Sequence, residues 1–477
     1  MKLVNVHLNT AVEEGERFDT LTAPAGTVAT LLEIERQLGI KDAIGVDESY
    51  PGREKTREFL HQTIAEHIKR ERVAILFTTL IYNAEPTIQL MRELRQEYGH
   101  HLHIVVGGQL IPLVKEPYLQ NTDVDTVCVG DAEVILPSLL ADLDAGSARL
   151  LYQGTLQHSG KRRVFAGASY DGFYMLEERM KVQRERAGFS QLLIQGPGGP
   201  GCSWAANNPE GPCNFCALQN ITTMNEVTLE EHFAREHALQ ERYHPDRIFD
   251  VANQFFPKQK RNEVIQWLTQ YIQARNKAGV TTPQYCYLTV SSVDEEVASL
   301  LQQAGIQEVY LGIDHFDPKA LKEENKPYRS RNTLTRCLDA LKKYGIRFRT
   351  GVVMGAARET PETLKSIEEG IAWMQREYRG YVRSIGIFPV EVIPGSDVFA
   401  KMKASGVRQD IFQSFEAKGY LTREEQHELT KAYIDYHSEV DAEEVYAVAK
   451  ELEGKTDATL LYTVDHSPGP EVLKKSF

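Results

Sequence analysis

Three cysteines within fifteen residues are the clearest chemical feature of this sequence. Cys202, Cys213 and Cys216 form a Cys-x10-Cys-x2-Cys cluster, and they are half of the six cysteines in the chain. Three thiolates can bind three irons of a 4Fe-4S cubane and leave the fourth iron open to a ligand. A structural zinc site is the alternative, although zinc prefers four protein ligands and the nearest histidines, His232 and His237, lie beyond the loop. Soft thiolates suit either metal.

Length and composition indicate a globular protein of two or three domains. The chain has 477 residues, of which 42% are hydrophobic and 25% are charged. A net charge of −13 argues against a general nucleic-acid binder, which would carry a basic face. No run of eighteen apolar residues predicts a membrane span, and residues 1–7 read as a strand instead of a signal peptide. Clustered cysteines then indicate metal binding in a reducing cytoplasm.

Residues 1–145 alternate strands and helices, which predicts a doubly wound, Rossmann-like parallel sheet. Ligands of such sheets bind at the carboxyl ends of the strands. The expected strands are 73–78, 103–106 and 126–129, and they end in Thr78-Thr79, Gly107-Gly108 and Gly130 to Glu133. Glycines there would let the backbone approach a large flat ligand, and ordinary strand-to-helix turns are the alternative.

The rest of the chain predicts a connector, a second α/β series and a helical tail. The connector, residues 146–188, has a polar hairpin at 157–163 and a charged helix at 176–187. Six strand-helix units in residues 189–405 predict a partial barrel, shorter than the eight-fold one. Residues 406–477 read as a charged, helical C-terminal region. The expected strands are 191–194, 247–251, 285–290, 308–311, 347–353 and 384–388.

At this point the chain resembles radical S-adenosylmethionine (SAM) enzymes that carry an N-terminal cobalamin-binding domain. The pieces that carry the resemblance occur in that family's order and spacing, and they extend over nearly the whole chain. They are Ile104 to Gly108 with Val127 to Glu133, Ala304 to Asp314 with Leu321 to Lys326, Val353 to Gly355 with Glu359-Thr360, and Pro394 to Ser396.

The sequence departs from this family in three places. The family's first cysteine interval is three residues and here it is ten, so Ser203 to Pro212 looks like an insertion. Such an interval can still close on a cubane, because loop closure costs only about 0.6 kcal/mol per doubling of length. Asp314 stands where the family more often has glutamate or glutamine. The Asp-x-His-x-x-Gly signature, which supplies a histidine to cobalt, is absent.

The resemblance implies reductive cleavage of SAM at a 4Fe-4S cluster held by the three cysteines, giving a 5′-deoxyadenosyl radical. It places Phe215 beside the adenine, Asn253 and Gln254 at the methionine end, Asp314 at the ribose and Gly355 against the adenine. A polar turn is the alternative for Asn253 and Gln254, and a helix N-cap is the alternative for Asp314. It implies that cobalamin is lined by Thr78, Thr79, Gly107, Gly108, Gln109, Gly130 and Glu133.

Three hypotheses compete for the function. The first is a cobalamin-dependent radical SAM enzyme that methylates an unactivated carbon. The second is a radical SAM enzyme for a rearrangement or oxidation, with cobalamin in another role or lost. The third is a zinc-binding, non-enzymatic protein, which the ordered motifs disfavour. A small molecule or peptide is the expected substrate, with a flavodoxin or ferredoxin as electron donor and with no nucleic-acid or membrane partner.

Two smaller expectations concern side chains that could face substrate. Pro209 and Pro212 limit the freedom of the long cysteine interval, so it should be ordered. We expect it to fold over the cluster with Trp204 as an apolar lid, and an exposed surface loop is the alternative. Tyr310, Tyr328 and Tyr381 could also face substrate, although aromatic residues near strand ends are more often part of the core.

Overall fold

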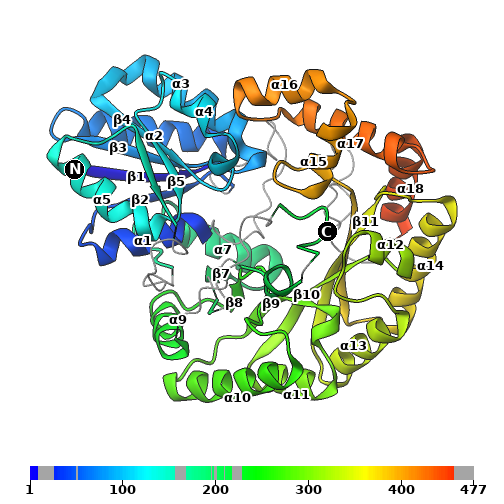
Figure 1. The fold of residues 1–477 in the computed structure, drawn as a ribbon. Coiled ribbons are helices and arrows are strands. Elements are labelled where there is room, and N and C mark those ends of the chain that lie inside the picture. The colour runs from blue at the N-terminus through cyan, green and yellow to red at the C-terminus, as the bar shows by residue number, and fades with distance from the viewer. Residues whose placement is uncertain are drawn as a thin grey trace. The chain divides into compact units, whose positions relative to one another are not determined.

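The computed structural model describes residues 1–8, 26–49, 52–155, 168–194, 196–197, 201–208, 210–217 and 228–455. The chain divides into two units (Figure 1). The first consists of residues 1–196, 225–249 and 412–422, and the second of residues 197–224, 250–411 and 423–477. The polar hairpin expected at 157–163 lies outside the described residues.

The first sheet has six strands in the order β2-β1-β3-β4-β5-β6, and every neighbouring pair is parallel. The chain therefore winds outward from β1 in both directions, which confirms the predicted parallel α/β sheet. Its strands are β1 (Lys2–His7), β2 (Ile44–Asp47), β3 (Val73–Thr78), β4 (Leu102–Gly107), β5 (Thr126–Gly130) and β6 (Leu151–Gly154). The helices are α1 (Gly26–Gln37), α2 (Arg53–His67), α3 (Ala84–Tyr98), α4 (Lys115–Leu119), α5 (Ala132–Ala145) and α7 (Leu176–Ala187).

Strand β6 lies in the segment that the sequence suggested was a connector. It pairs with β5 from Val127↔Leu151 to Gly130↔Gly154 and so forms the edge of the first sheet. Four residues with only one fully buried side chain, Tyr152, give too short an apolar pattern for a strand to be recognised. The charged helix expected at 176–187 coincides with α7.

The second sheet also has six strands, in the order β12-β11-β10-β9-β8-β7. Its strands are β7 (Gln191–Ile194), β8 (Arg247–Asp250), β9 (Gln284–Thr289), β10 (Ile306–Asp314), β11 (Arg347–Met354) and β12 (Val382–Pro389). The pairs β9–β10, β10–β11 and β11–β12 are parallel. Each strand neighbours the next one in the chain, as strand-helix units require.

Helices alternate with these strands. They are α8 (Ser203–Asn207), α9 (Leu229–Tyr243), α10 (Arg261–Ala278), α11 (Glu295–Gln303), α12 (Pro318–Glu323), α13 (Arg331–Lys343) and α14 (Pro361–Glu377). Of these, α10, α11, α13 and α14 cover one side of β9 to β12 (Figure 1). Helix α13 shows why they form. Ser330 caps its first turn through the backbone N–H of Thr333, and Leu334, Cys337, Leu338 and Leu341 bury one face.

Four further helices follow β12: α15 (Asp397–Ser405), α16 (Gln409–Lys418), α17 (Arg423–His437) and α18 (Ala442–Lys455). Helix α17 and the turn after it contact the segments that leave the carboxyl ends of β11 and β12. The Gln426 amide donates to the Val392 carbonyl at 2.9 Å, and the Ser438 hydroxyl donates to the Ala356 carbonyl at 2.8 Å. Helix α17 therefore packs at these strand ends, where ligands of parallel sheets bind.

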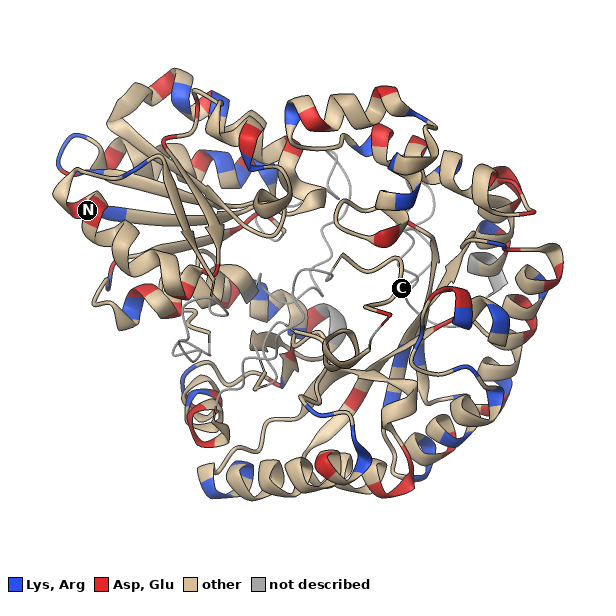
Figure 2. Ribbon diagram, viewed as in Figure 1, with Lys and Arg blue, Asp and Glu red and all other residues tan. Residues whose placement is uncertain are grey.

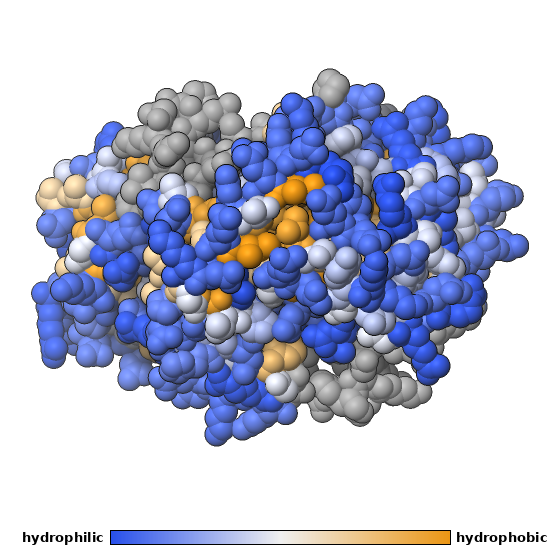
Figure 3. Space-filling model, turned by 90° about the horizontal axis from the view of Figure 1, so that it is seen from below, coloured by the Kyte–Doolittle hydropathy of each residue, from blue (hydrophilic) through white to orange (hydrophobic). Residues whose placement is uncertain are grey.

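The surface is polar and carries both charge signs. Basic and acidic residues are interspersed along the helices (Figure 2). The face drawn in Figure 3 is mostly hydrophilic, with an apolar area near its middle and smaller ones elsewhere. Among the described helices, none combines the length and the apolar character that crossing a membrane requires.

Candidate functional site

The structure brings the three clustered cysteines together in the second unit. Cys202 directly precedes α8, and the Cys216 N–H donates to the Cys213 carbonyl at 3.0 Å in a tight turn. None of the three thiols forms a disulfide, and all three are half-buried. Burial raises the pKa of the Cys213 thiol to about 12, against the lowering effect of Lys326, and Cys202 and Cys216 raise it further. The three sulfurs are therefore close enough to influence one another's ionisation.

Within the described ranges, no three His, Cys, Asp or Glu side chains are placed to hold one metal ion. A cubane makes a different demand, since each of its three protein ligands binds a different iron and the thiols stand correspondingly apart. A set of three thiols has the donor chemistry that such a cluster requires.

The long cysteine interval is folded and hydrogen-bonded to the end of α12. The sequence suggested a loop, but residues 203–207 form helix α8. The Trp204 side chain is half-buried, and its indole N–H donates to the Asn325 carbonyl at 3.1 Å. The Asn325 amide donates to the carbonyls of Gly211 at 3.0 Å and Pro212 at 2.9 Å. Whether this interval lines a substrate cavity stays a prediction.

The same helix end also holds the residue between Cys213 and Phe215. The Asn214 backbone N–H donates to the Glu324 carbonyl at 3.2 Å, and its side-chain amide donates to the Glu323 carbonyl. Hydrogen bonds to residues 323–325 thus fix the chain on both sides of Cys213, at Pro212 and at Asn214. Sequence reasoning noted this segment only as a family-like motif and did not predict its contact with the cysteines.

Gln254 connects the start of α8 to the end of β9. Its side-chain oxygen accepts hydrogen bonds from the Ser203 hydroxyl at 2.7 Å and the Trp204 N–H at 3.4 Å, and it lies 3.6 Å from the Cys202 sulfur. Its amide nitrogen lies 3.4 Å from the Thr289 hydroxyl. Gln254 is buried whereas Asn253 is exposed. Of these two predicted residues, the structure brings Gln254 to the cysteine loop.

Asp314 ends β10 and is ion-paired with Lys326. Burial alone would lower the pKa of Lys326, but the adjacent Asp314 carboxylate raises it, so the ammonium stays charged. The ammonium lies 5.3 Å from the centre of the Phe215 ring. Asp314 has a φ of 60°, and the cap of the next helix is Asp317, so the alternative reading of Asp314 as an N-cap is wrong.

Glu324 is a buried acid that sequence reasoning missed. Neither of its carboxyl oxygens has a hydrogen-bond partner. Burial and the nearby Asp314 raise its pKa well above the ordinary value, because both disfavour the charged carboxylate. In the sequence it lies within the charged run Lys322 to Lys326, which reads as solvent-exposed. Only the fold reveals that this position points inward.

Gly355 is packed against the C-terminal helices. A β-carbon there would lie 2.8 Å from Ile434 atoms and 3.4 Å from a Val445 atom, so α17 and α18 occupy the neighbouring space. Its N–H donates to Glu359 at 3.2 Å. This packing explains the glycine without a ligand, and contact with adenine stays a prediction.

The three tyrosines singled out from the sequence occupy different places. The Tyr310 hydroxyl would lie 2.5 Å from a β-carbon at Gly351, so it covers that glycine on the neighbouring strand. Tyr328 is buried, and its hydroxyl donates to the Ile313 carbonyl at 2.6 Å. Tyr381 precedes β12 and thus lies at the amino end of that strand, away from the cysteines.

The first unit gathers the other predicted residues at the carboxyl ends of β3, β4 and β5. Thr78, Thr79 and Glu133 are buried, and Gln109 is exposed. A β-carbon at Gly108 would lie 2.3 Å from the Thr79 carbonyl oxygen. Close packing of strands therefore explains this glycine.

Two further glycines at this edge differ in whether packing leaves room for a β-carbon. A β-carbon at Gly130 would lie 2.0 Å from the Gly154 carbonyl oxygen, so strand packing requires glycine there as well. At Gly107 a β-carbon would meet only ordinary contact, 3.4 Å from Cys128. Packing therefore gives no reason for glycine at Gly107, whose carbonyl accepts from the Thr79 N–H at 2.7 Å.

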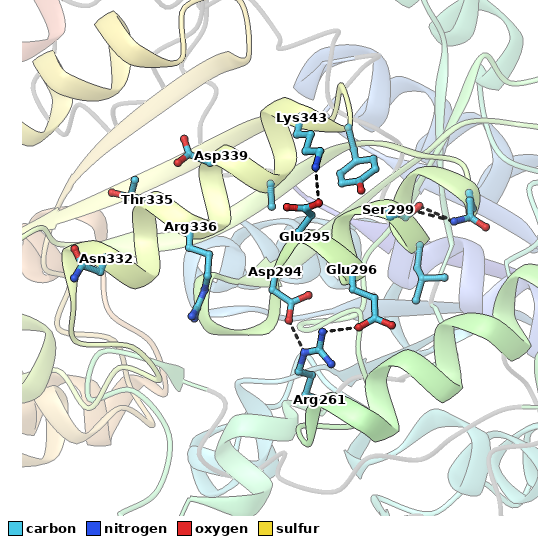
Figure 4. A pocket seen from close by; sticks show the side chains of 14 residues that line it. Arg261, Asp294, Glu295, Glu296, Ser299, Asn332, Thr335, Arg336, Asp339 and Lys343 are labelled. Atoms are coloured by element: carbon cyan, nitrogen blue, oxygen red, sulfur yellow. Dashed lines mark hydrogen bonds and ion pairs between the residues drawn. The ribbon is translucent and has the colours of Figure 1, made fainter.

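A groove of about 1010 Å³ lies elsewhere, between α11 and α13 with the start of α10 (Figure 4). Arg261 pairs with Asp294 and with Glu296 at 2.6 Å, and Lys343 pairs with Glu295. Its lining comes from surface helices and includes none of the clustered cysteines. These charged side chains largely satisfy one another, so the groove is not part of the candidate site.

Comparison with known proteins identifies the fold. No protein-family model and no curated protein sequence matches the chain. Among solved structures, the radical SAM methyltransferase TsrM from Kitasatospora setae, with tryptophan and a SAM analogue bound, has a TM-score of 0.62 and 15% identity. This match covers 85% of this chain and 77% of that one. TsrM with cobalamin and a [4Fe-4S] cluster bound gives 0.61 and 14%, over 85% and 79%.

The cobalamin-dependent SAM radical enzyme OxsB, with aqua-cobalamin and SAM bound, is also similar. Its TM-score is 0.60 at 13% identity, and the match covers 98% of this chain and 62% of OxsB. Identities this low speak to fold alone. Together the matches extend the likeness over nearly the whole chain, as the ordered sequence motifs predicted.

Proposed function

We propose that this chain, which has the fold of cobalamin-dependent radical SAM enzymes, is itself such an enzyme and methylates an unactivated carbon of a small molecule or peptide. One observation carries the proposal. In a chain with this fold, the three thiols of Cys202, Cys213 and Cys216 lie together beside the buried Asp314–Lys326 pair.

The cysteines would hold a 4Fe-4S cluster, which supplies the electron for reductive cleavage of SAM when bound. Lys326 supports this assignment, because its ammonium lowers the pKa of the Cys213 thiol and so favours the thiolate that iron binds. Residues 323–325 hold the loop by hydrogen bonds to its backbone. The chain's own contribution is thus to orient three thiolates and to keep one positive charge near them.

SAM would lie beside the same residues. Phe215 is available to the adenine, and the Asp314 carboxylate to the ribose hydroxyls, where it would share its charge with Lys326. Gln254 is the better candidate for the methionine end, since it already reaches the Cys202 sulfur whereas Asn253 faces solvent. We assign this site to a partial barrel formed from residues 189–405, which would shield reactive species from water.

Cobalamin, which would carry the methyl group, fits the carboxyl edge of the first sheet. No packing contact requires glycine at Gly107, and the buried Thr79 hydroxyl has no hydrogen-bond partner. Gly108, Gln109, Gly130 and Glu133 complete the edge. Without the Asp-x-His-x-x-Gly signature, we propose that no protein histidine ligates the cobalt.

The alternative is a radical SAM enzyme that catalyses a rearrangement or oxidation without methyl transfer. The missing histidine signature keeps it open, because a domain that has lost cobalamin would also lack the signature. In either case an electron donor such as a flavodoxin or ferredoxin would be required. Tryptophan is present in one TsrM structure, which makes aromatic amino acids a first set of substrates to screen.

Analysis of the products of SAM separates these possibilities. Anaerobically reconstituted protein would be incubated with SAM, hydroxocobalamin and a low-potential reductant, with Cys213→Ala as the matched control. We expect both S-adenosylhomocysteine and 5′-deoxyadenosine from the wild type and neither from the control. Deoxyadenosine alone would favour the alternative. Stoichiometric zinc, no iron and no cleavage of SAM would reject the proposal.

A further inference from the structure

The C-terminal end of α12 holds three successive residues, Glu324, Asn325 and Lys326, in a fixed backbone conformation. The Lys326 N–H donates to the Leu321 carbonyl at 2.9 Å, and the Asn325 N–H donates to the Lys322 carbonyl at 3.1 Å. These two bonds are the Schellman pattern, in which the residue after the helix takes a left-handed conformation. Asn325 has a φ of 56°, a value that asparagine tolerates better than most residues.

This conformation turns both polar ends of Asn325 toward the cysteine interval. Its side-chain amide nitrogen lies within 3.4 Å of three successive carbonyl oxygens, at residues 210, 211 and 212. Its side-chain oxygen accepts from the Asn208 amide at 3.1 Å, and its backbone carbonyl accepts from the Trp204 indole. One residue therefore contacts the interval at both of its ends.

The neighbours of Asn325 extend the connection. Glu324 accepts through its backbone carbonyl from Asn214, the residue after Cys213, and Lys326 is paired with Asp314. The helix end thus ties the cysteine loop to the end of β10. These contacts join residues more than 100 positions apart, so they do not arise from local chain geometry.

We propose that Asn325 is the positioning residue of the three-cysteine site, holding the ten-residue interval in the shape that presents Cys213 and Cys216 to a cluster. This inference rests on the proposed function for the cluster, but the docking itself can be measured without metal. A family member with a three-residue interval would have no such segment to hold. The long interval and Asn325 therefore act together in this chain.

The test compares two variants that keep the backbone conformation. Asn325→Gly retains a left-handed residue and removes the amide. Asn325→Asp retains the side-chain size and the side-chain oxygen acceptor but loses the two N–H donors of the side-chain amide. Lys322→Ala, at an exposed side chain of the same helix, is the matched control. Metal-free full-length protein is treated with iodoacetamide, and alkylation of each cysteine is followed by mass spectrometry.

We expect both Asn325 variants to raise the alkylation rate of Cys213 at least about tenfold, while Cys286, buried in β9, keeps the wild-type rate. Cys286 reports global unfolding, so its constancy shows that the change is local. Reconstituted variants should also lose iron to EDTA about tenfold faster than the wild type and Lys322→Ala.

Unchanged Cys213 alkylation, or parallel acceleration of Cys213 and Cys286, would overturn the inference even if the wild type binds iron. Conversely, local acceleration at Cys213 in a protein that takes up no iron would leave the docking intact and reject the proposed function. Normal iron retention despite faster alkylation would show that the docking does not position the cluster, and would also overturn the inference.

Discussion

The ammonium of Lys326 is ion-paired with the carboxylate of Asp314, and the two side chains are only 9% and 13% exposed. Such a pair costs much desolvation to form, yet breaking it leaves a buried charge without a partner. Its place beside Phe215 and Cys213 links a stability element to the candidate site.

Lys326→Met should therefore destabilise the protein strongly. We expect its free energy of unfolding in urea to fall by about 3–5 kcal/mol, the usual cost of removing one member of a buried pair. The double variant Lys326→Met with Asp314→Asn should lose less than Lys326→Met alone, since neither charge then remains. Lys322→Met, at an exposed position, should change little. A loss in the double variant equal to the sum of the losses of Lys326→Met and Asp314→Asn measured singly would mean that the pair is not energetically coupled.

The cysteine assignment predicts a defined metal content. Anaerobic reconstitution should give about four irons and four sulfides per chain, and replacing Cys202, Cys213 and Cys216 by alanine should abolish the brown chromophore. Cys128→Ala, in β5 of the first unit, is the control and should keep the full iron content. Retention of the chromophore in the triple variant would place the cluster elsewhere.

The sequence supported the fold well where apolar runs were uninterrupted. The expected strands at 73–78 and 191–194 coincide with β3 and β7. Helix α13 also has local signals, namely the apolar spacing of its buried face and the Ser330 cap. Strand β2 was missed, since four residues without a turn signal give no clear period.

The candidate site was predictable only in part, because its decisive contacts are long-range. The thiol spacing pointed to the metal chemistry, but nothing local indicates that Asn325 binds carbonyls 113 positions away. Glu324 reads as a surface residue, and Gly355 reads as a ligand contact although Ile434 fills the space beside it. Burial and long-range hydrogen bonds follow from the packed fold, so residue type alone does not predict them.

The absence of a histidine signature predicts how cobalamin would bind. Protein loaded with cob(II)alamin should give an electron paramagnetic resonance spectrum without nitrogen splitting from a protein imidazole. The reason is that the sequence lacks the Asp-x-His-x-x-Gly signature that would supply the histidine. A nitrogen-split spectrum that persists when the cofactor's own base is replaced would contradict this prediction.

Two adjacent glycines should respond differently to alanine. Gly108 has a φ of 113° and lies against the Thr79 backbone, so Gly108→Ala should cost at least about 2 kcal/mol of unfolding free energy. Gly107→Ala meets only ordinary contact and should cost about 1 kcal/mol or less. Chemical denaturation checks both values. If Gly107 lines cobalamin, Gly107→Val should also weaken cobalamin uptake while the protein remains folded.

The last prediction concerns a buried acid in the first unit. The Asn5 amide donates to Glu35 Oε2 at 2.8 Å, whereas Glu35 Oε1 and Asn5 Oδ1 are buried without partners. Burial raises the pKa of Glu35 to about 8, against the lowering effect of Asn5. Protonation of Glu35 removes a buried charge and gives the side chain an O–H donor.

Because the folded pKa lies above the unfolded value of 4.5, this group's stabilising contribution is complete below pH 4.5 and is lost as pH rises through about 8. We expect unfolding free energy to fall by a few kcal/mol from this source across that window, on the order set by linkage. Glu35→Gln carries a permanent amide donor, so its stability should vary less with pH and exceed the wild type at pH 8.5. Glu66→Gln, at an exposed site of α2, should keep the wild-type profile. Parallel profiles for wild type and Glu35→Gln in urea unfolding from pH 5 to 8.5 would show that Glu35 does not titrate in this window.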